Sequence, residues 1–284
     1  MHAAVFANAV TEVFQYDFLR RALIAAVLVG ITAPAVGVFL VQRRLALIGD
    51  GLGHVAVTGV ALGLVLHRTP VFVAVIVAVL GAVAIEIVRA AGETTGEIAL
   101  AVLFYGGIAG GVVLVSKAPS GSRNLTQYLF GTITTTSNGD LIVFAVLAAV
   151  VLAVVILLGP ALFTVSNDEE FARALGIPVM AINILLATLT ALTVVVSMRV
   201  VGVLLVSALM VVPVATAQLF AGSFRSTCLW AVAVALVSAV VGIIVSYAAD
   251  LPSGGTIVLI AIAFFVFTLV GSSTLRLVRG RGAH

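Results

Sequence analysis

The sequence predicts an all-α polytopic membrane protein, and three observations carry that prediction. Of its 284 residues, 63% are hydrophobic and only 9% are charged, and the mean hydropathy is +1.33. A soluble globular chain carries about 25% charged residues, so this chain is too poor in charge to cover a water-facing surface. Its apolar segments are long and continuous, without the alternation of a lipid-facing β-barrel, and they favour helices, which satisfy their backbone hydrogen bonds internally.

The apolar segments predict a bundle of about nine transmembrane helices, eight or nine in all, within one domain that covers residues 1–284. Each segment is close to the roughly 20 residues that cross about 30 Å of hydrocarbon. The predicted spans are residues 18–41, 45–66, 71–88, 97–116, 141–163, 179–198, 203–221, 227–249 and 256–275.

The basic residues predict how these spans lie in the cytoplasmic membrane. With the N-terminus outside, eight of the 14 Lys and Arg residues fall on the side that the positive-inside rule makes cytoplasmic. These eight are Arg43, Arg44, Arg89, Arg173, Arg225, Arg276, Arg279 and Arg281. Because the basic residues lie mainly at helix ends, membrane topology explains the net charge of +3 better than nucleic-acid binding does. We therefore predict a multi-pass protein of the cell membrane.

The sequence gives no sign of an enzyme. Its only lysine, Lys117, is not part of a Gly-x-x-x-x-Gly-Lys-Ser/Thr phosphate loop, so the chain does not bind ATP in that manner. A His-Glu-x-x-His zinc-protease motif is also absent from the sequence. The single cysteine, Cys228, excludes an internal disulfide and a multi-cysteine metal site. We expect a transport role, with no catalytic residues and no permanently bound cofactor.

Two ionisable residues lie inside the predicted span 45–66, where a charge is costly and usually functional. Asp50 and His54 are four residues apart and share one helix face, and Thr58 continues the same stripe. If the helix starts at Leu45, His54 lies roughly 13 Å along it, near the middle of the bilayer. A carboxylate and an imidazole suit Zn²⁺ or Mn²⁺ as ligands. A twofold axis beside the helix would bring two such pairs together and supply four ligands.

Two other interpretations of this pair stay open: an Asp–His hydrogen bond that only satisfies two buried groups, and a proton relay. Thr58, Ser207 and Pro213 are further candidates for the path or its gate. Pro213 predicts a kink in the seventh span, and we favour a static kink over a gating hinge. Glu86 lies near the end of its span beside Arg89, and we expect an interfacial ion pair.

A short amphipathic helix is predicted at about residues 167–177, in a loop on the cytoplasmic side. Asp168 is a suitable N-cap, and Glu169 and Glu170 suit the first turn, where the helix dipole favours negative charge. Gly176 suits the end of this helix.

At these motifs the sequence resembles the permease subunits of ABC-type importers for zinc, manganese or iron. The resemblance covers about Phe14 to Leu275, and several separate motifs occur in the family's order. They lie at residues 43–54, 128–131, 168–178, 201–209, 213–217 and 250–256. Two places depart from the family pattern: Gly53, where Ser or Ala is commoner, and residues 96–101, which lack the usual Asp-Thr-Ala start.

The resemblance implies a homodimeric permease joined to two ATP-binding subunits and fed by an extracytoplasmic metal-binding capture protein. It implies that Asp50 and His54 coordinate the transported ion, zinc or manganese, with iron as a third option. ATP hydrolysis would belong to the separate subunits. The short cytoplasmic helix matches the segment that docks on the ATPase, and the positions carried over are Asp168, Glu169, Glu170, Ala172 and Gly176.

Two alternative functions are kept open. An ABC permease for a metal chelate or a vitamin needs a wide, mostly uncharged path, in which Asp50 and His54 would be structural. A proton-coupled secondary transporter would use the pair as a relay and would need neither an ATPase nor a docking helix.

Overall fold

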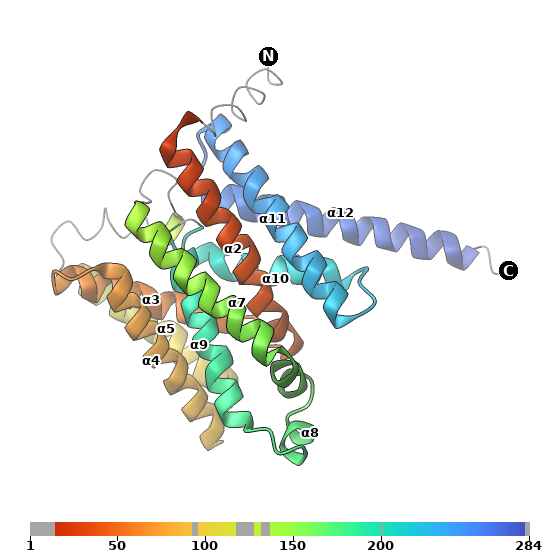
Figure 1. Ribbon diagram of the computed structural model, residues 1–284, viewed down its shortest axis with the longest axis horizontal. Coiled ribbons are helices and arrows are strands. Elements are labelled where there is room, and N and C mark those ends of the chain that lie inside the picture. Colours follow the sequence, from red (N-terminus) through yellow and green to blue (C-terminus); the bar gives the residue numbers. More distant parts are fainter. Residues whose placement is uncertain (1–14, 93–95, 118–127, 132–136, 200, 282–284) are drawn as a thin grey trace.

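The computed structural model describes residues 15–92, 96–117, 128–131, 137–199 and 201–281, and these form a helical bundle without strands (Figure 1). The predicted all-α fold is confirmed, and each helix overlaps a predicted segment. The helices are α2 (Asp17–Gln42), α3 (Ile48–Val65), α4 (Pro70–Ala91), α5 (Gly96–Val115), α7 (Asn138–Asn167), α8 (Glu169–Ala174), α9 (Val179–Ser197), α10 (Val203–Gln218), α11 (Phe224–Ala249) and α12 (Ser253–Arg281).

Within the described part of the chain, eight helices are long and apolar enough to cross a membrane. The helix in the predicted span 203–221 differs, because α10 ends at Gln218 and has 16 residues. At 1.5 Å per residue it is about 24 Å long, shorter than the hydrocarbon core. It begins after Gly202, whose φ is +86° and where a Cβ atom would overlap the carbonyl oxygen of Leu129. A close backbone contact therefore marks the start of α10.

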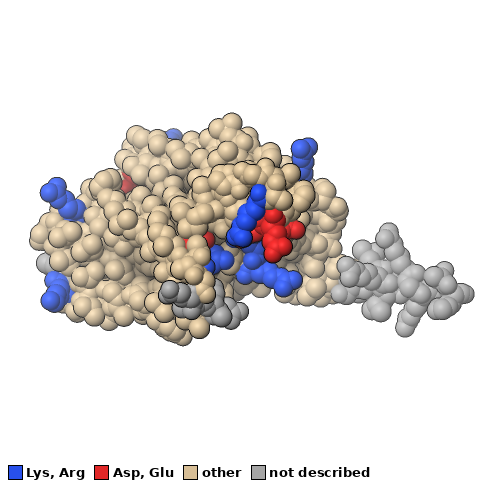
Figure 2. All heavy atoms as spheres, turned by 90° about the horizontal axis from the view of Figure 1, so that it is seen from below, with Lys and Arg blue, Asp and Glu red and all other residues tan. Residues whose placement is uncertain are grey.

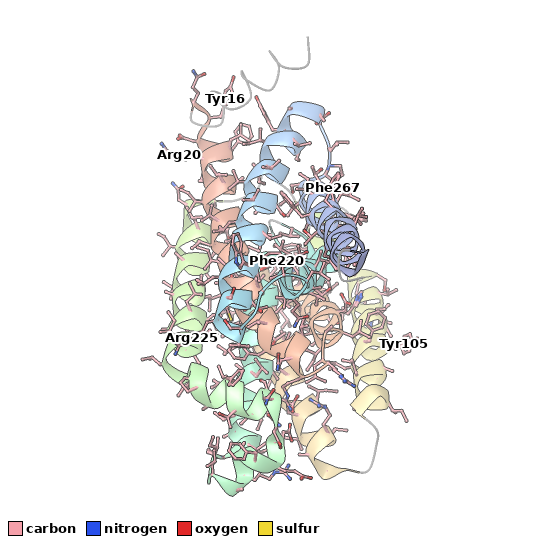
Figure 3. The ribbon with its side chains drawn as sticks, turned by 90° about the vertical axis from the view of Figure 1, so that its right-hand side faces the viewer. Tyr16, Arg20, Tyr105, Phe220, Arg225 and Phe267 are labelled. Carbon is pink, nitrogen blue, oxygen red and sulfur yellow. The ribbon has the colours of Figure 1, made fainter. Side chains whose placement is uncertain are left out.

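The outer surface of the bundle is largely apolar. Large side chains of α5, α7 and α12 are exposed, among them Leu157 and Phe267, and Figure 3 shows Tyr105 and Phe267 pointing away from the bundle. In water such a surface would favour association, whereas in a bilayer it meets lipid chains of the same polarity. On the face drawn in Figure 2 most of the surface is uncharged; one group brings acidic and basic side chains together, and other basic side chains stand apart near the edges.

The ends of two helices are fixed by capping side chains. Ser137 Oγ accepts a hydrogen bond from the Asp140 backbone N–H (3.2 Å), and Asp140 Oδ2 accepts one from the Ser137 N–H (3.1 Å), which caps α7. The predicted cap of the short helix is also confirmed, because Asp168 Oδ1 accepts from the Phe171 N–H at 3.0 Å. These bonds satisfy backbone donors that lack partners at a helix start.

Candidate functional site

Asp50 lies in the first turn of α3, where the helix dipole stabilises its carboxylate. Its Oδ1 atom accepts a hydrogen bond from the hydroxyl of Ser207 on α10. The partners are 157 residues apart in sequence, so tertiary packing brings them together. Ser207, predicted only as a candidate for the path, thus holds one oxygen of the Asp50 carboxylate and leaves the other free of this bond.

The start of α3 differs from the prediction and changes the position of His54 along its helix. The chain leaves α2 through a turn in which Arg44 has a positive φ of +58°, and the helix begins at Ile48 instead of Leu45. His54 therefore lies about 9 Å from the start of its helix, and not 13 Å.

His54 is half-buried and packs against α5. Its ring meets the Phe104 ring edge-on, with centroids 4.6 Å apart and planes at 77°. Helix α5 approaches closely because residue 107 is glycine: a Cβ atom there would lie 2.7 Å from the Val55 nitrogen. Thr58 Oγ1 reinforces this contact by donating to the Gly107 carbonyl oxygen at 2.6 Å.

Asp50, His54 and Thr58 are each partly buried on one side of α3, as their four-residue spacing predicts. This side lies between α10, which supplies Ser207, and α5, which supplies Phe104 and the Gly107 carbonyl. Among the described residues, no group of three or more His, Cys, Asp or Glu side chains is placed to hold a metal ion. One chain therefore offers a carboxylate and an imidazole, and a closed metal site would need ligands from elsewhere.

A second polar site surrounds the short helix α8. The Glu169 carboxylate pairs with Arg43, which directly follows α2, and accepts a hydrogen bond from Asn183 Nδ2 of α9 at 3.2 Å. Arg43 Nη1 also donates to Asn183 Oδ1 at 2.8 Å, so the three side chains form a closed triangle. Arg173 lies 3.6 Å from the other Glu169 oxygen. We call Arg43, Glu169 and Asn183 the α8 triangle.

The guanidinium of Arg43 is almost fully enclosed, with 7% of its side chain exposed. Burial lowers the pKa of Arg43 from its usual value, and the neighbouring Glu169 carboxylate opposes that shift. Since a guanidinium stays protonated in proteins, the enclosed charge of Arg43 is compensated by the Glu169 carboxylate.

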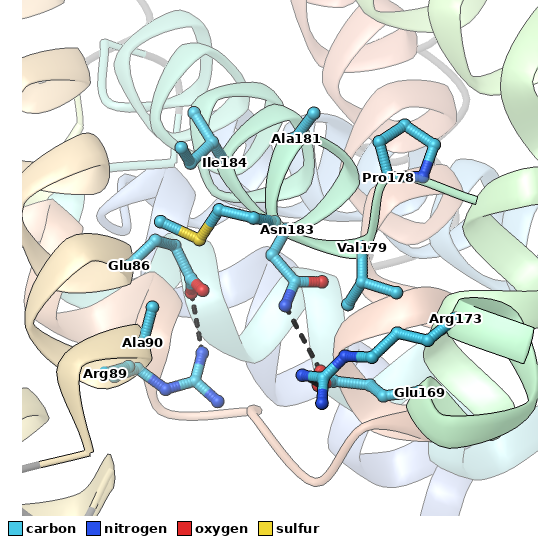
Figure 4. Close-up of a pocket in the computed structure, with 11 residues that line it drawn as sticks. Glu86, Arg89, Ala90, Glu169, Arg173, Pro178, Val179, Ala181, Asn183 and Ile184 are labelled. Atoms are coloured by element: carbon cyan, nitrogen blue, oxygen red, sulfur yellow. Dashed lines mark hydrogen bonds and ion pairs between the residues drawn. The ribbon is translucent and has the colours of Figure 1, made fainter. Parts of the chain in front are cut away.

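A cavity of about 750 Å³ opens between α4, α8 and the start of α9, and Figure 4 shows its lining. Glu86 and Arg89 line the α4 side and form an ion pair of 2.6 Å, which confirms the pairing predicted for them. Glu169, Arg173 and Asn183 line the opposite side. The charged groups around this cavity therefore already have partners.

The remaining predicted residues of α8 divide between an inner and an outer face. Ala172 is fully buried against the bundle. Asp168, Glu170 and Gly176 are exposed, and they lie beside the exposed apolar side chains of Phe171 and Leu175. Helix α8 thus turns Glu169 and Ala172 inward and presents a mixed polar and apolar face outward.

Pro213 lies within α10, six residues beyond Ser207, and is buried. Its backbone position interrupts the hydrogen-bond ladder of the helix, as any internal proline does.

Sequence reasoning missed an ion pair at the opposite end of the bundle. Arg199 pairs with Asp140 at the start of α7 and donates to the Tyr128 hydroxyl at 3.1 Å. Its guanidinium also lies 5.5 Å from the centre of the Tyr128 ring. The available signal was that Asp140 and Arg199 are charged residues at the ends of spans on the same predicted side. We call Arg199, Asp140 and Tyr128 the α7 cluster.

Comparison with known proteins gives a consistent set of relatives. Residues 15–272 match the ABC 3 transport family. The manganese transport system membrane protein MntC of Halalkalibacterium halodurans is 34% identical over 254 residues, which cover 89% of this chain and 87% of that protein. The high-affinity zinc uptake system membrane protein ZnuB of Haemophilus influenzae is 30% identical over 254 residues, covering 89% and 97% respectively. Among solved structures, PsaBC from Streptococcus pneumoniae in complex with Fab aligns with a TM-score of 0.84 at 31% identity, over 92% of this chain and 94% of that chain.

Proposed function

The chain belongs to the ABC 3 transport family, and we propose that it is the membrane permease subunit of an importer that carries a divalent transition-metal ion, manganese or zinc, across the cell membrane. The observation that carries the metal assignment is the Asp50–His54 pair on one side of α3. Carboxylate oxygen and imidazole nitrogen are ligands that both ions accept, and iron(II) accepts them as well.

The surroundings of the pair suit a site that must be ready before the ion arrives. The Ser207 hydroxyl orients the Asp50 carboxylate, and the Phe104 ring restricts the orientation of His54. Hydrogen-bond partners of this kind commonly hold metal ligands in place and affect affinity by about 10–100-fold. A transporter must release its ion, so we expect the site to hold the ion only transiently.

A second copy of the chain would complete the site. Two chains related by a twofold axis beside α3 would contribute two carboxylates and two imidazoles, the four ligands that a tetrahedral ion accepts. Such an axis needs an apolar surface close to α3. Helix α5, which packs on α3, exposes Val102, Tyr105 and Val112 on its outer side. We therefore propose that the permease acts as a homodimer.

The same assignment gives the permease two kinds of partner. Two ATP-binding subunits would dock on the outer face of α8, where Glu170, Phe171 and Leu175 are exposed, and would supply the hydrolysis for which this sequence has no phosphate loop. A capture protein would deliver the ion at the opposite end of the bundle. Movement of α8 would then open the path alternately to the two sides, as a two-state change between rigid parts.

Uptake of ⁵⁴Mn²⁺ and ⁶⁵Zn²⁺ into proteoliposomes that hold the full complex tests this proposal. We expect Asp50→Asn and His54→Asn each to lower uptake by at least about tenfold, because each removes a ligand from both copies. The matched controls are Asp250→Asn and His67→Asn, which make the same changes at exposed positions with positive φ, a conformation that Asn tolerates. Both controls should transport as the wild type does.

The preferred isotope in the wild-type complex identifies the cargo. Normal uptake by both α3 variants would overturn the metal site. Uptake that follows an imposed proton gradient and proceeds without ATP would favour a proton relay through the pair instead.

A further inference from the structure

The α8 triangle connects the docking helix to the helix that carries Asp50. Arg43 is the first residue after α2, and Asp50 follows it by seven residues. The Glu169 carboxylate is therefore bonded to the turn that leads directly into α3. On its other side the triangle holds Asn183, in the first turns of α9.

The turn between α2 and α3 is held by several backbone hydrogen bonds. The Arg43 N–H donates to Phe39 O (3.1 Å), and the Leu45 N–H donates to Leu40 O (2.8 Å). The Ile48 N–H then donates to Leu45 O at 3.0 Å. A shift of Arg43 would therefore act on a short, hydrogen-bonded turn that leads into the first turn of α3, where the Asp50 carboxylate lies.

Besides the triangle, α8 contacts α7, which it follows after one residue, and α9. The 750 Å³ cavity lies on one side of Glu169. A second cavity, of about 310 Å³ and lined by Gln42, Arg43, Arg89 and Asn167, lies on the other side. Ala172 is the buried apolar side chain of α8. Charge-assisted hydrogen bonds are about twice as strong as neutral ones, so the triangle is a strong polar connection between α8 and the turn that precedes α3.

We propose that Glu169 is a positioning residue that couples α8 to the metal path by holding Arg43, so that motion of α8 displaces the start of α3. This inference rests on the proposed transport function and deepens it. It gives Glu169 an inward role, distinct from the outer face of α8 on which a partner subunit would dock.

The number of ions imported per ATP hydrolysed tests this role, measured with the full complex in proteoliposomes. Glu169→Gln keeps an acceptor for Asn183 and removes the charge that holds Arg43. We expect ATP hydrolysis within about twofold of wild type and at least a fivefold fall in ions imported per ATP. Glu169→Asp keeps the charge on a shorter side chain, and its number of ions imported per ATP should lie between those of the wild type and Glu169→Gln. The exchange Arg43→Glu with Glu169→Arg should restore part of the lost coupling.

Asp17→Asn is the matched control, since it removes the carboxylate of an exposed ion pair with Arg20 at the start of α2, at the opposite end of the bundle from α8 (Figure 1). This variant should leave the number of ions imported per ATP unchanged. If uptake and ATP hydrolysis fall together in Glu169→Gln, Glu169 serves docking and the coupling role is wrong. An unchanged ratio in Glu169→Gln would also overturn it, while wild-type metal uptake would still support the proposed function. A wild-type complex that imports neither ion would instead refute the proposed function itself.

Discussion

The α8 triangle and the α7 cluster use the same chemistry at opposite ends of the bundle, and they differ in what surrounds them. Each pairs an arginine with a carboxylate far away in sequence and adds a polar third member. In the α7 cluster, Asp140 also caps its own helix through Ser137, so it is anchored locally as well. In the α8 triangle, Glu169 stands between two cavities. The first arrangement holds long helices together, and the second connects a short helix that has room to move.

The largest effect on stability is expected from breaking the α7 cluster. Arg199→Gln leaves the Asp140 carboxylate without its counter-charge, and the side chain of Asp140 is only 21% exposed. We expect a loss of about 2–3 kcal/mol, because an uncompensated, mostly buried charge remains. Unfolding by SDS in mixed micelles measures this change in the free energy of unfolding. Arg20→Gln, at an exposed ion pair, is the control. The number of ions imported per ATP should not change. A fall in that number would mean that the α7 cluster, like the α8 triangle, takes part in coupling.

A smaller loss of stability is expected at the α8 triangle. Arg43→Gln leaves Glu169 36% exposed to water and still within reach of Arg173 and Asn183. Since water and these partners stabilise the charge of the carboxylate, we expect the free energy of unfolding to fall by about 1–2 kcal/mol in the same SDS titration. A loss larger than that of Arg199→Gln would mean that the triangle mainly stabilises the fold.

The smallest effect is expected from Tyr128→Phe, which removes one hydroxyl from the α7 cluster. It deletes the 3.1 Å hydrogen bond from Arg199 and keeps the ring beneath the guanidinium. Such a bond contributes about 0.5–1.5 kcal/mol, as the SDS titration should register. An effect as large as that of Arg199→Gln would show that the hydroxyl, and not the Asp140 carboxylate, is the main partner of the arginine.

The sequence predicted the parts of the molecule that local rules govern. The first helix was placed within one residue at both ends, because Asp17 and Arg43 mark the polar limits of an apolar segment. The Asp168 cap and the Glu86–Arg89 pair also follow from residues three positions apart. The common side of Asp50 and His54 follows from helical periodicity alone.

What the sequence did not predict depends on segments that meet only in the folded chain. No local signal assigned Arg43 to Glu169, 126 residues away, or Arg199 to Asp140. The start of α3 was placed three residues early, because the positive φ of Arg44 is unusual for a residue other than glycine. The edge-on contact of Phe104 with His54 likewise depends on how closely Gly107 lets α5 approach.

The short helix α10 has a consequence for hydrophobic matching. A helix that meets lipid must match the thickness of the hydrocarbon or deform the bilayer around it. The described side chains of α10 up to Ala217 are all buried or half-buried, and α2, α3, α11 and α12 pack around it. Its length of about 24 Å is therefore set by its neighbours and not by membrane thickness. The depth at which it presents Ser207 to Asp50 should stay the same in thin and thick bilayers, while the outer helices tilt to adapt.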